Sequence, residues 1–270
     1  MRQMWRRAQS HRVLGHLLRF RPLAFLLAVL MVLGTASATA EAPTGDVLLD
    51  TIDGQDVRLD IPATSDPKGL AIYFHGQNGG AENRMDEPWL QALGRSGWAI
   101  ASSDFHTASW GNEASTQDTV NLIEWAEKLS GEPVRIFVSG SMGATVSLNA
   151  MTHGVDAPVC WYGVKPAVDP TKMDAVPGAN RIIQGAYGGP VPPDRNPALN
   201  ADEFSVDTRY RMVASKKDQW VRYDENAGLL SQELESRGAD VSILEVKGTH
   251  DDESHFDVAD LVEFAAGCGD

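Results

Sequence analysis

The chain has 270 residues, of which 43% are hydrophobic, and its formal net charge is −14 at pH 7. A chain of this length forms one large domain or two modest ones. The excess of acidic side chains disfavours nucleic acids and anionic membrane surfaces as partners, because both carry negative charge.

The first 40 residues differ in composition from the rest and predict an export signal. Six arginines and no acidic residue lie within 1–21, and an apolar run of eleven residues follows at 23–33. Small residues then offer cleavage after Ala38 or Ala40. An apolar run this short favours cleavage over an uncleaved membrane anchor, because a span needs about 20 residues. We therefore expect a secreted or periplasmic protein with no stable membrane partner once the signal is removed.

Cleavage would leave a single domain over residues 41–270, with 17 basic and 37 acidic side chains. This segment is long enough for one hydrophobic core. Its two cysteines are Cys160 and Cys268, and an oxidising compartment would permit a disulfide that ties the C-terminal tail to the body. Cys160 lies in an apolar run, VCWYGV, so a buried free thiol is an equal alternative.

The predicted elements begin with a hairpin at 46–63, where two alternating apolar runs flank Asp53-Gly54. Short apolar runs then alternate with segments of helix length, a pattern typical of a parallel sheet. In chain order the predicted strands are GLAIYFHG, WAIASSDF, VRIFVSG, APVCWYGV, RYRMVAS and VSILEVKG.

The predicted helices are MDEPWLQALGRSG, STQDTVNLIEWAEKLSG, ATVSLNAMTHG, VRYDENAGLLSQELESRG and HFDVADLVEFAA. For the second of them we expect Ser115 or Thr116 as the N-cap. The Pro- and Gly-rich segment at about 165–205 has no clear period and is expected to be a loop with short helical turns. A loop of this length in a compact domain is usually functional or mobile.

The stretch SGSMG at 139–143 joins a predicted strand to a predicted helix without a gap, and it places Ser141 at the turn. Such a turn holds a nucleophilic serine above the edge of a sheet, usually in the pattern G-x-S-x-G. Here Ser139 replaces the first glycine, while Gly143 keeps the last. The alternative is an ordinary small-residue turn, since Gly and Ser are common in turns.

A glycine-rich turn, HGQNGG at 75–80, follows the first central strand. Its backbone N–H groups are candidates to stabilise a developing oxyanion, together with the N–H of Met142, the residue after the candidate nucleophile. The alternative is that this turn only connects a strand to a helix.

A serine hydroxyl needs a base to take its proton, and the base needs an acid to orient it. Asp218 in KKDQWV and His250 in KGTHDD follow two late strands, in the chain order Ser, Asp, His. Alternatively, Asp218 caps a helix. His255 competes with His250 but is expected at the start of the last helix. The acidic cluster here lacks a recognised ligand spacing, so no metal is expected.

These motifs together resemble the α/β-hydrolase fold serine hydrolases over nearly the whole of residues 41–270. The resemblance implies an α/β domain with a mostly parallel central sheet, an N-terminal antiparallel hairpin and helices on both faces. The sequence departs from the family pattern at Ser139 and at Asp104-Phe105-His106, where many relatives have an aspartate followed by a glycine-rich turn.

The same resemblance implies roles for individual residues. Ser141 is the expected nucleophile, His250 the general base and acid, and Asp218 the residue that orients His250. The N–H groups of Gln77 and Met142 form the expected oxyanion hole, and no cofactor is needed.

Four aromatic residues near the expected strand ends are candidate substrate contacts, with packing as the alternative for the three tryptophans. They are His106, Trp110, Trp161 and Trp220.

From this resemblance, together with the predicted export signal, we expect an exported hydrolase that cleaves small carboxylic esters or acylated substrates through an acyl-enzyme. A peptidase or amidase with the same triad is the first alternative. A secreted binding protein that keeps the fold without the chemistry is the second.

Overall fold

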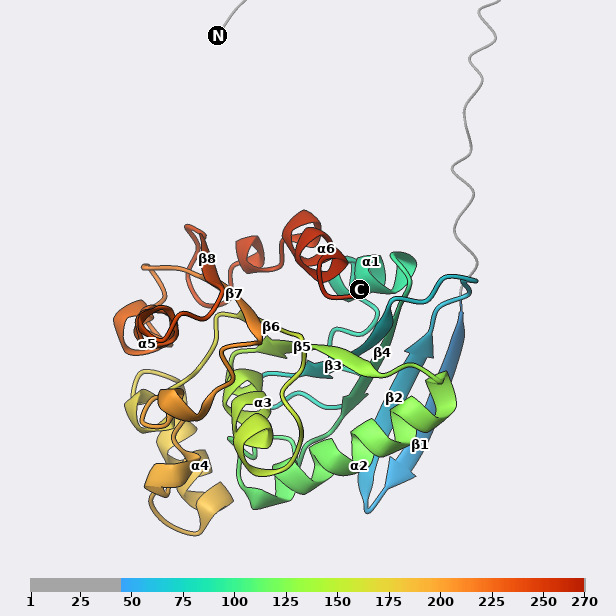
Figure 1. Ribbon diagram of the computed structural model, residues 1–270. Coiled ribbons are helices and arrows are strands. Elements are labelled where there is room, and N and C mark those ends of the chain that lie inside the picture. Colours follow the sequence, from blue (N-terminus) through green and yellow to red (C-terminus); the bar gives the residue numbers. More distant parts are fainter. Residues whose placement is uncertain (1–44, 270) are drawn as a thin grey trace, which may run out of the picture. The chain divides into compact units, whose positions relative to one another are not determined.

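Eight strands form one mixed sheet in the order β1-β2-β4-β3-β5-β6-β7-β8 (Figure 1). The computed structural model describes residues 45–269. The expected export signal at residues 1–40, with its cleavage sites, lies outside the described residues. Within the described range no helix is long and apolar enough to cross a membrane.

The first two strands form the predicted antiparallel hairpin, and β2 also pairs antiparallel with β4. Asp53 and Gly54 make its turn with φ of 49° and 83°, values that favour the Asp-Gly pair found here. The remaining pairs are all parallel. The strands are β1 (Asp46–Ile52), β2 (Gln55–Ile61), β3 (Gly69–Phe74), β4 (Trp98–Ser103), β5 (Val134–Gly140), β6 (Cys160–Val164), β7 (Arg209–Ala214) and β8 (Val241–Glu245).

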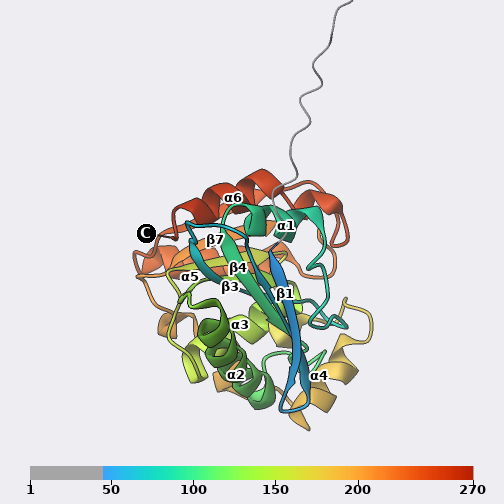
Figure 2. The same ribbon diagram turned by 90° about the vertical axis from the view of Figure 1, so that its right-hand side faces the viewer.

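Helices cover both faces of the sheet. Figure 2 shows α1 (Pro88–Arg95) and α6 (Val258–Ala266) on one side, and α2 (Glu113–Ser130) and α3 (Met142–His153) on the other. The helix α5 (Ala227–Ser236) packs on the same face of the sheet as α2 and α3. Successive strand residues alternate between the two cores, because side chains of a strand point to opposite faces in turn. Thus Tyr73 packs on the α1 side and Phe74 on the α3 side.

The start of α2 differs from the prediction. The N-cap is Asn112, whose side-chain oxygen accepts a hydrogen bond from the N–H of Ser115 at 3.1 Å. The hydroxyls of Ser115 and Thr116, predicted as caps, instead donate to the Asn112 carbonyl. Asn is as good a cap as Ser, so the helix begins at the earlier of two suitable positions.

The segment at 165–205 contains more regular structure than predicted. It includes a helix of nine residues, α4 (Ala179–Tyr187), with Gly178 and Gly188 in left-handed conformation at its two ends. The side chain of Tyr187 donates to the carbonyl of Trp110 at 2.7 Å and ties α4 to the loop after β4. Three short 3₁₀ turns complete the segment: η1 (Pro170–Lys172), η2 (Pro193–Arg195) and η3 (Ala201–Glu203).

Two late helices begin further along the chain than predicted. The helix predicted from Val221 divides into the turn η4 (Tyr223–Glu225) and α5. His255, expected at the start of the last helix, ends the turn η5 (Glu253–His255), and α6 begins at Val258.

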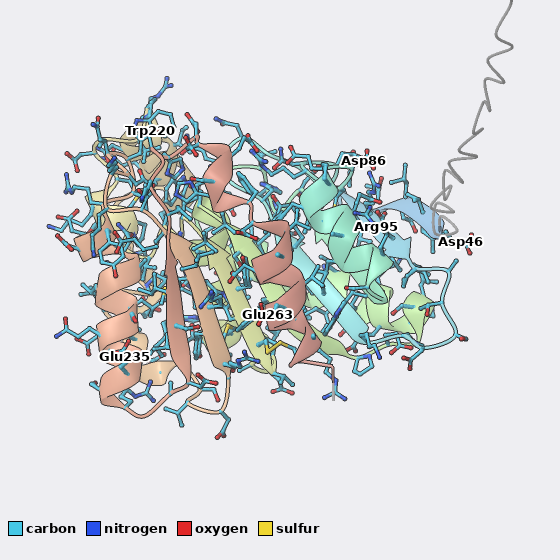
Figure 3. All side chains as sticks on the ribbon, turned by 90° about the horizontal axis from the view of Figure 1, so that it is seen from above. Asp46, Asp86, Arg95, Trp220, Glu235 and Glu263 are labelled. Carbon is cyan, nitrogen blue, oxygen red and sulfur yellow. A yellow bond between two sulfur atoms is a disulfide. The ribbon has the colours of Figure 1, made fainter. Side chains whose placement is uncertain are left out.

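For the two cysteines the sequence left open a bridge or free thiols. They form a disulfide that joins Cys160 in β6 to Cys268, two residues beyond the end of α6 (Figure 3). It closes a loop with a sequence separation of 108 residues. Replacing both cysteines with alanine should lower the free energy of unfolding by about 2–5 kcal/mol, because the unfolded chain regains the freedom that the loop removes. Urea denaturation of the oxidised protein measures this change.

Reductant provides the control for this prediction. Dithiothreitol should lower the urea midpoint of the wild type and leave that of the double variant unchanged. A wild-type midpoint that neither reductant nor the double substitution moves would contradict the stabilising role of the bridge.

Candidate active site

Ser141 lies at the sharp turn between β5 and α3, with φ of 52° and ψ of −115°. A non-glycine residue at positive φ is strained, and such strain persists only where the surroundings hold it. Gly143 permits the turn, since a Cβ built on it would lie 2.2 Å from the carbonyl oxygen of Phe74 in β3. Only glycine allows the first turn of α3 to approach the sheet this closely.

Ser139 takes the place of the usual first glycine without loss of packing. It is fully buried, and its hydroxyl donates to that of Ser147 on α3 at 2.8 Å. The indole N–H of Trp161 donates to the same Ser147 oxygen at 2.9 Å. The additional side chain therefore links the strand to the helix that it precedes, and the turn keeps its form.

Ser141, His250 and Asp218 come together from three loops at the carboxyl ends of β5, β8 and β7. The Ser141 hydroxyl oxygen lies 3.1 Å from Nε2 of His250, and Nδ1 of His250 lies 2.7 Å from Oδ2 of Asp218. With the ring proton on Nδ1, facing the carboxylate, Nε2 is free to accept the hydroxyl proton. His250 and Asp218 are buried, whereas Ser141 is partly exposed.

The loop after β7 fixes the carboxylate of Asp218. Its second oxygen, Oδ1, accepts from the backbone N–H groups of Trp220 and Val221 at 2.9 and 3.0 Å. Burial raises the pKa of Asp218, but the bond to His250 and these two N–H groups outweigh it, so the pKa lies below its ordinary value. The alternative role as a helix cap is not met, because α5 begins at Ala227.

The competing histidine, His255, forms its hydrogen bond within its own turn and not with Ser141. It is fully buried, and its Nδ1 lies 3.0 Å from the carbonyl oxygen of Asp252. Its Nε2 has no hydrogen-bond partner among residues 45–269. Burial lowers the pKa of His255 and favours the neutral ring. His250 is therefore the histidine in hydrogen-bond reach of Ser141.

The glycine-rich turn after β3 lies directly against Ser141. A Cβ built on Gly76 would be 3.6 Å from the Cβ of Ser141. Across the described residues, no carbonyl accepts a bond from the N–H of Gln77 or of Met142, so both groups are free to donate. Met142 is the first residue of α3, where the helix leaves its N–H groups unpaired. Both N–H groups are therefore candidates to donate hydrogen bonds to the oxyanion that would form when the Ser141 oxygen adds to a carbonyl carbon.

The side chain of Gln77 is held at both ends. Its Oε1 accepts from the indole N–H of Trp110 at 3.1 Å, and its Nε2 donates to the carbonyl of Pro177 at 3.4 Å. Trp110, expected as a substrate contact, therefore holds the side chain of Gln77 in the glycine-rich turn and is itself buried in the core.

A pocket of about 340 Å³ opens beside Ser141. It is lined by the turn after β3, by Val176 and Pro177 ahead of α4, and by residues at the ends of β6, β7 and β8. Trp220 is part of its wall, with its ring centroid 5.2 Å from that of His250, and lies at the carboxyl end of the strands (Figure 3). This volume is near the lower limit for ligand pockets and suits a small substrate.

Three of the four aromatic residues expected as substrate contacts do not line this pocket. Trp110 and Trp161 are buried in the core on the α3 side. Trp161 points to this face because side chains alternate along β6, and its neighbours Cys160 and Tyr162 point to the other face. His106 is half exposed and pairs with Asp118 on α2, with its Nδ1 2.6 Å from the carboxylate. The structure therefore places these three outside the pocket wall, and a contact with substrate stays a prediction that only Trp220 is positioned to make.

Several residues of the pocket wall were not predicted from the sequence, among them Tyr73, Arg84, Lys165 and Phe256. Lys165 directly follows β6, so the rule that placed Ser141 at the end of β5 also locates it. Arg84 and Phe256 lie in irregular segments, for which the sequence offers no such signal. Within the described part of the chain, no group of three His, Cys, Asp or Glu side chains is placed to hold a metal ion.

No family model and no curated protein matches this sequence. Many solved structures are nevertheless similar to it in fold. An acylaminoacyl peptidase from Pyrococcus horikoshii aligns with a TM-score of 0.67 and 14% identity over 84% of this chain. The alignment spans 42% of the peptidase.

Two esterases align over nearly their whole length. Est1E from Butyrivibrio proteoclasticus gives a TM-score of 0.63 and 17% identity, over 82% of this chain and 98% of its own. Esterase 2 from Thermogutta terrifontis, phosphoramylated by tabun, gives 0.62 and 14%, over 85% of this chain and 96% of its own. At such low identity these similarities concern the fold.

Proposed function

On the α/β-hydrolase fold that residues 45–269 adopt, we propose that this protein is a serine hydrolase that cleaves carboxylic esters through an acyl-enzyme. The observation that carries the proposal is the continuous line from the Ser141 hydroxyl through His250 to Asp218 beside a pocket. A serine hydroxyl, an imidazole and a buried carboxylate in this order are the parts that acyl transfer needs.

In the proposed reaction the Ser141 oxygen attacks the ester carbonyl while Nε2 of His250 takes the hydroxyl proton. The carbonyl oxygen becomes an oxyanion, which accepts hydrogen bonds from the N–H groups of Gln77 and Met142. When the tetrahedral intermediate collapses, His250 returns its proton to the leaving alcohol and the acyl group stays on Ser141. Water then attacks the acyl-enzyme by the same steps, which releases the acid and restores the serine.

Two observations support small esters as substrates. The structures matched over nearly their whole length are both esterases, whereas the peptidase is matched over 42%. The pocket of about 340 Å³ has room for a small acyl or alcohol group. We propose export as well, supported by the disulfide between Cys160 and Cys268, because disulfides persist in oxidising compartments.

The test compares 4-nitrophenyl butyrate with butyryl 4-nitroanilide, which differ only in the bond that is cleaved. We expect turnover of the ester with kcat/KM of about 10⁴ M⁻¹s⁻¹ or more, and no anilide turnover above background. An anilide rate within about tenfold of the ester rate would support the peptidase alternative. Turnover of neither, by protein that is folded by circular dichroism, would support a binding protein.

A further inference from the structure

The pocket beside Ser141 contains hydrogen-bond donors that the proposed reaction does not use. They are Tyr73, Arg84 and Lys165, which come from β3, from the loop before α1 and from the end of β6. Phe256 belongs to the same wall, and its ring is in contact with both cations. The whole chain carries a net charge of −14, so a pair of cations gathered in one small pocket runs against the overall composition.

Lys165 is buried, and its ammonium group donates one hydrogen bond, to the carbonyl of His250 at 2.8 Å. Among residues 45–269 it forms no ion pair, so its remaining N–H groups have no acceptor there. Nearby carboxylates, among them Asp251, act on Lys165 without contact. A buried charge without an ion-pair partner is costly, and an anion in the pocket would offset that cost. Burial and, second, the charge of Arg84 lower the pKa of Lys165.

Arg84 brings a second positive charge to the same place. Its guanidinium carbon lies 3.8 Å from the centroid of the Phe256 ring, and Nζ of Lys165 lies 5.1 Å from the same centroid. One N–H of Arg84 pairs with Glu87, which does not line the pocket, and the other N–H groups of the fork stay available. Two neighbouring cations repel each other, whereas an anion in contact with both is attracted twice.

Tyr73 adds a neutral donor next to the catalytic turn. Only 1% of the residue is exposed, and its hydroxyl has no hydrogen-bond partner in the described range. A Cβ built on Gly140 would lie 3.8 Å from this hydroxyl oxygen, one residue before Ser141. Burial raises the pKa of Tyr73, so the hydroxyl keeps its proton and can donate it to an acceptor.

We propose that Tyr73, Arg84 and Lys165 form a subsite for a carboxylate on the ester substrate, so that the protein prefers acid-bearing esters to neutral esters of the same size. This inference rests on the proposed function. Asp251 is the acidic residue of the wall that is not in the triad, and it is exposed. Its charge offsets part of the fall in the pKa of Lys165 that burial causes, but among residues 45–269 it forms no ion pair with Lys165 or with Arg84, whose partner is Glu87.

Two matched pairs of esters test the preference and locate the carboxylate. The mono-4-nitrophenyl ester of adipic acid against 4-nitrophenyl hexanoate places the acid in the acyl part. The second pair, 3-acetoxybenzoate against 3-acetoxybenzamide, places it in the leaving group. With spontaneous hydrolysis subtracted, kcat/KM for the acid-bearing ester of at least one pair should exceed that of its neutral partner by about tenfold or more.

The Arg84→Gln variant should reduce that acid-to-neutral ratio about tenfold, mainly through KM for the acid-bearing ester. Tyr73→Phe keeps the ring and removes one donor, so it should reduce the ratio several-fold even if Arg84→Gln folds poorly. The control is Arg95→Gln, an exposed arginine of α1 that should leave the ratio unchanged.

Ratios near or below one for both pairs in the wild type would overturn the subsite and leave the proposed function standing. A ratio that Arg84→Gln and Tyr73→Phe leave unchanged would also overturn it. Absence of turnover on all four esters would overturn the proposed function, and the subsite with it.

Discussion

Replacing Ser141 with alanine is expected to lower kcat toward 4-nitrophenyl butyrate by about 10⁶-fold, the largest effect of any single substitution in this protein. The variant keeps the fold, the pocket and the free N–H groups of Gln77 and Met142, and loses only the atom that forms the acyl-enzyme. The residual rate, from binding and the oxyanion donors, should remain above that of water. Initial rates with purified variant, checked for carry-over of wild type, measure it.

The matched control is Ser139→Ala, two residues earlier, near the end of β5. The Ser139 hydroxyl bonds to Ser147 in the core and points at no atom of the pocket, so its loss should change kcat by less than about threefold. Similar losses of kcat in Ser139→Ala and Ser141→Ala would mean that any substitution near the turn impairs catalysis, and would contradict the assignment of Ser141 as the nucleophile.

Asp218→Asn is expected to lower kcat by about 10⁴-fold with little change in stability. The Asn oxygen can still accept from the N–H groups of Trp220 and Val221, so the loop is kept. The amide then presents N–H to Nδ1 of His250, which forces the ring proton onto Nε2. With that tautomer the ring cannot take the proton of Ser141.

A second His–Asp pair in the same chain supplies the control. Nδ1 of His106 lies 2.6 Å from Asp118, much as His250 lies from Asp218, but neither residue lines the pocket. Asp118→Asn should therefore leave kcat within about threefold of wild type. Equal losses in Asp118→Asn and Asp218→Asn would show that the effect is not specific to the pair beside Ser141.

Much of the fold was predictable because its signals are local. Each parallel strand is a short apolar run bounded by polar turns, and each was predicted within a few residues of its observed limits. The Asp53-Gly54 turn predicted the hairpin in the same way. The similar solved structures confirm the α/β-hydrolase fold that the motifs indicated.

The predictions failed at two kinds of place. In one, two nearby residues are equally good helix caps; in the other, contacts with distant segments determine where a helix forms. Asn112 and Ser115 are both good caps, and no local rule separates them. The apolar residues of α4 recur at helical spacing, but the helix has only nine residues between two glycines, and it is held in place by bonds to the loop after β4, such as Asn112 to the carbonyl of Ala186. Such contacts between distant segments are not visible in the sequence.

The site was predictable as far as the topology orders it. Carboxyl ends of parallel strands share one edge, and this brings Ser141, Asp218 and His250 together. Which way a side chain points is less visible: Trp161 faces the core on the α3 side although it is close in sequence to Lys165 in the pocket wall. The guanidinium of Arg84 in the pocket wall lies against the ring of Phe256, which is far along the chain.

The most direct test of the central claim is the site of covalent modification by a fluorophosphonate. Peptide mapping by mass spectrometry after reaction of the full chain should find one phosphonyl group, on the peptide that contains Ser141, and none in the Ser141→Ala variant. No adduct on the folded wild type, or an adduct on another residue that persists in Ser141→Ala, would contradict the claim that Ser141 is the nucleophile.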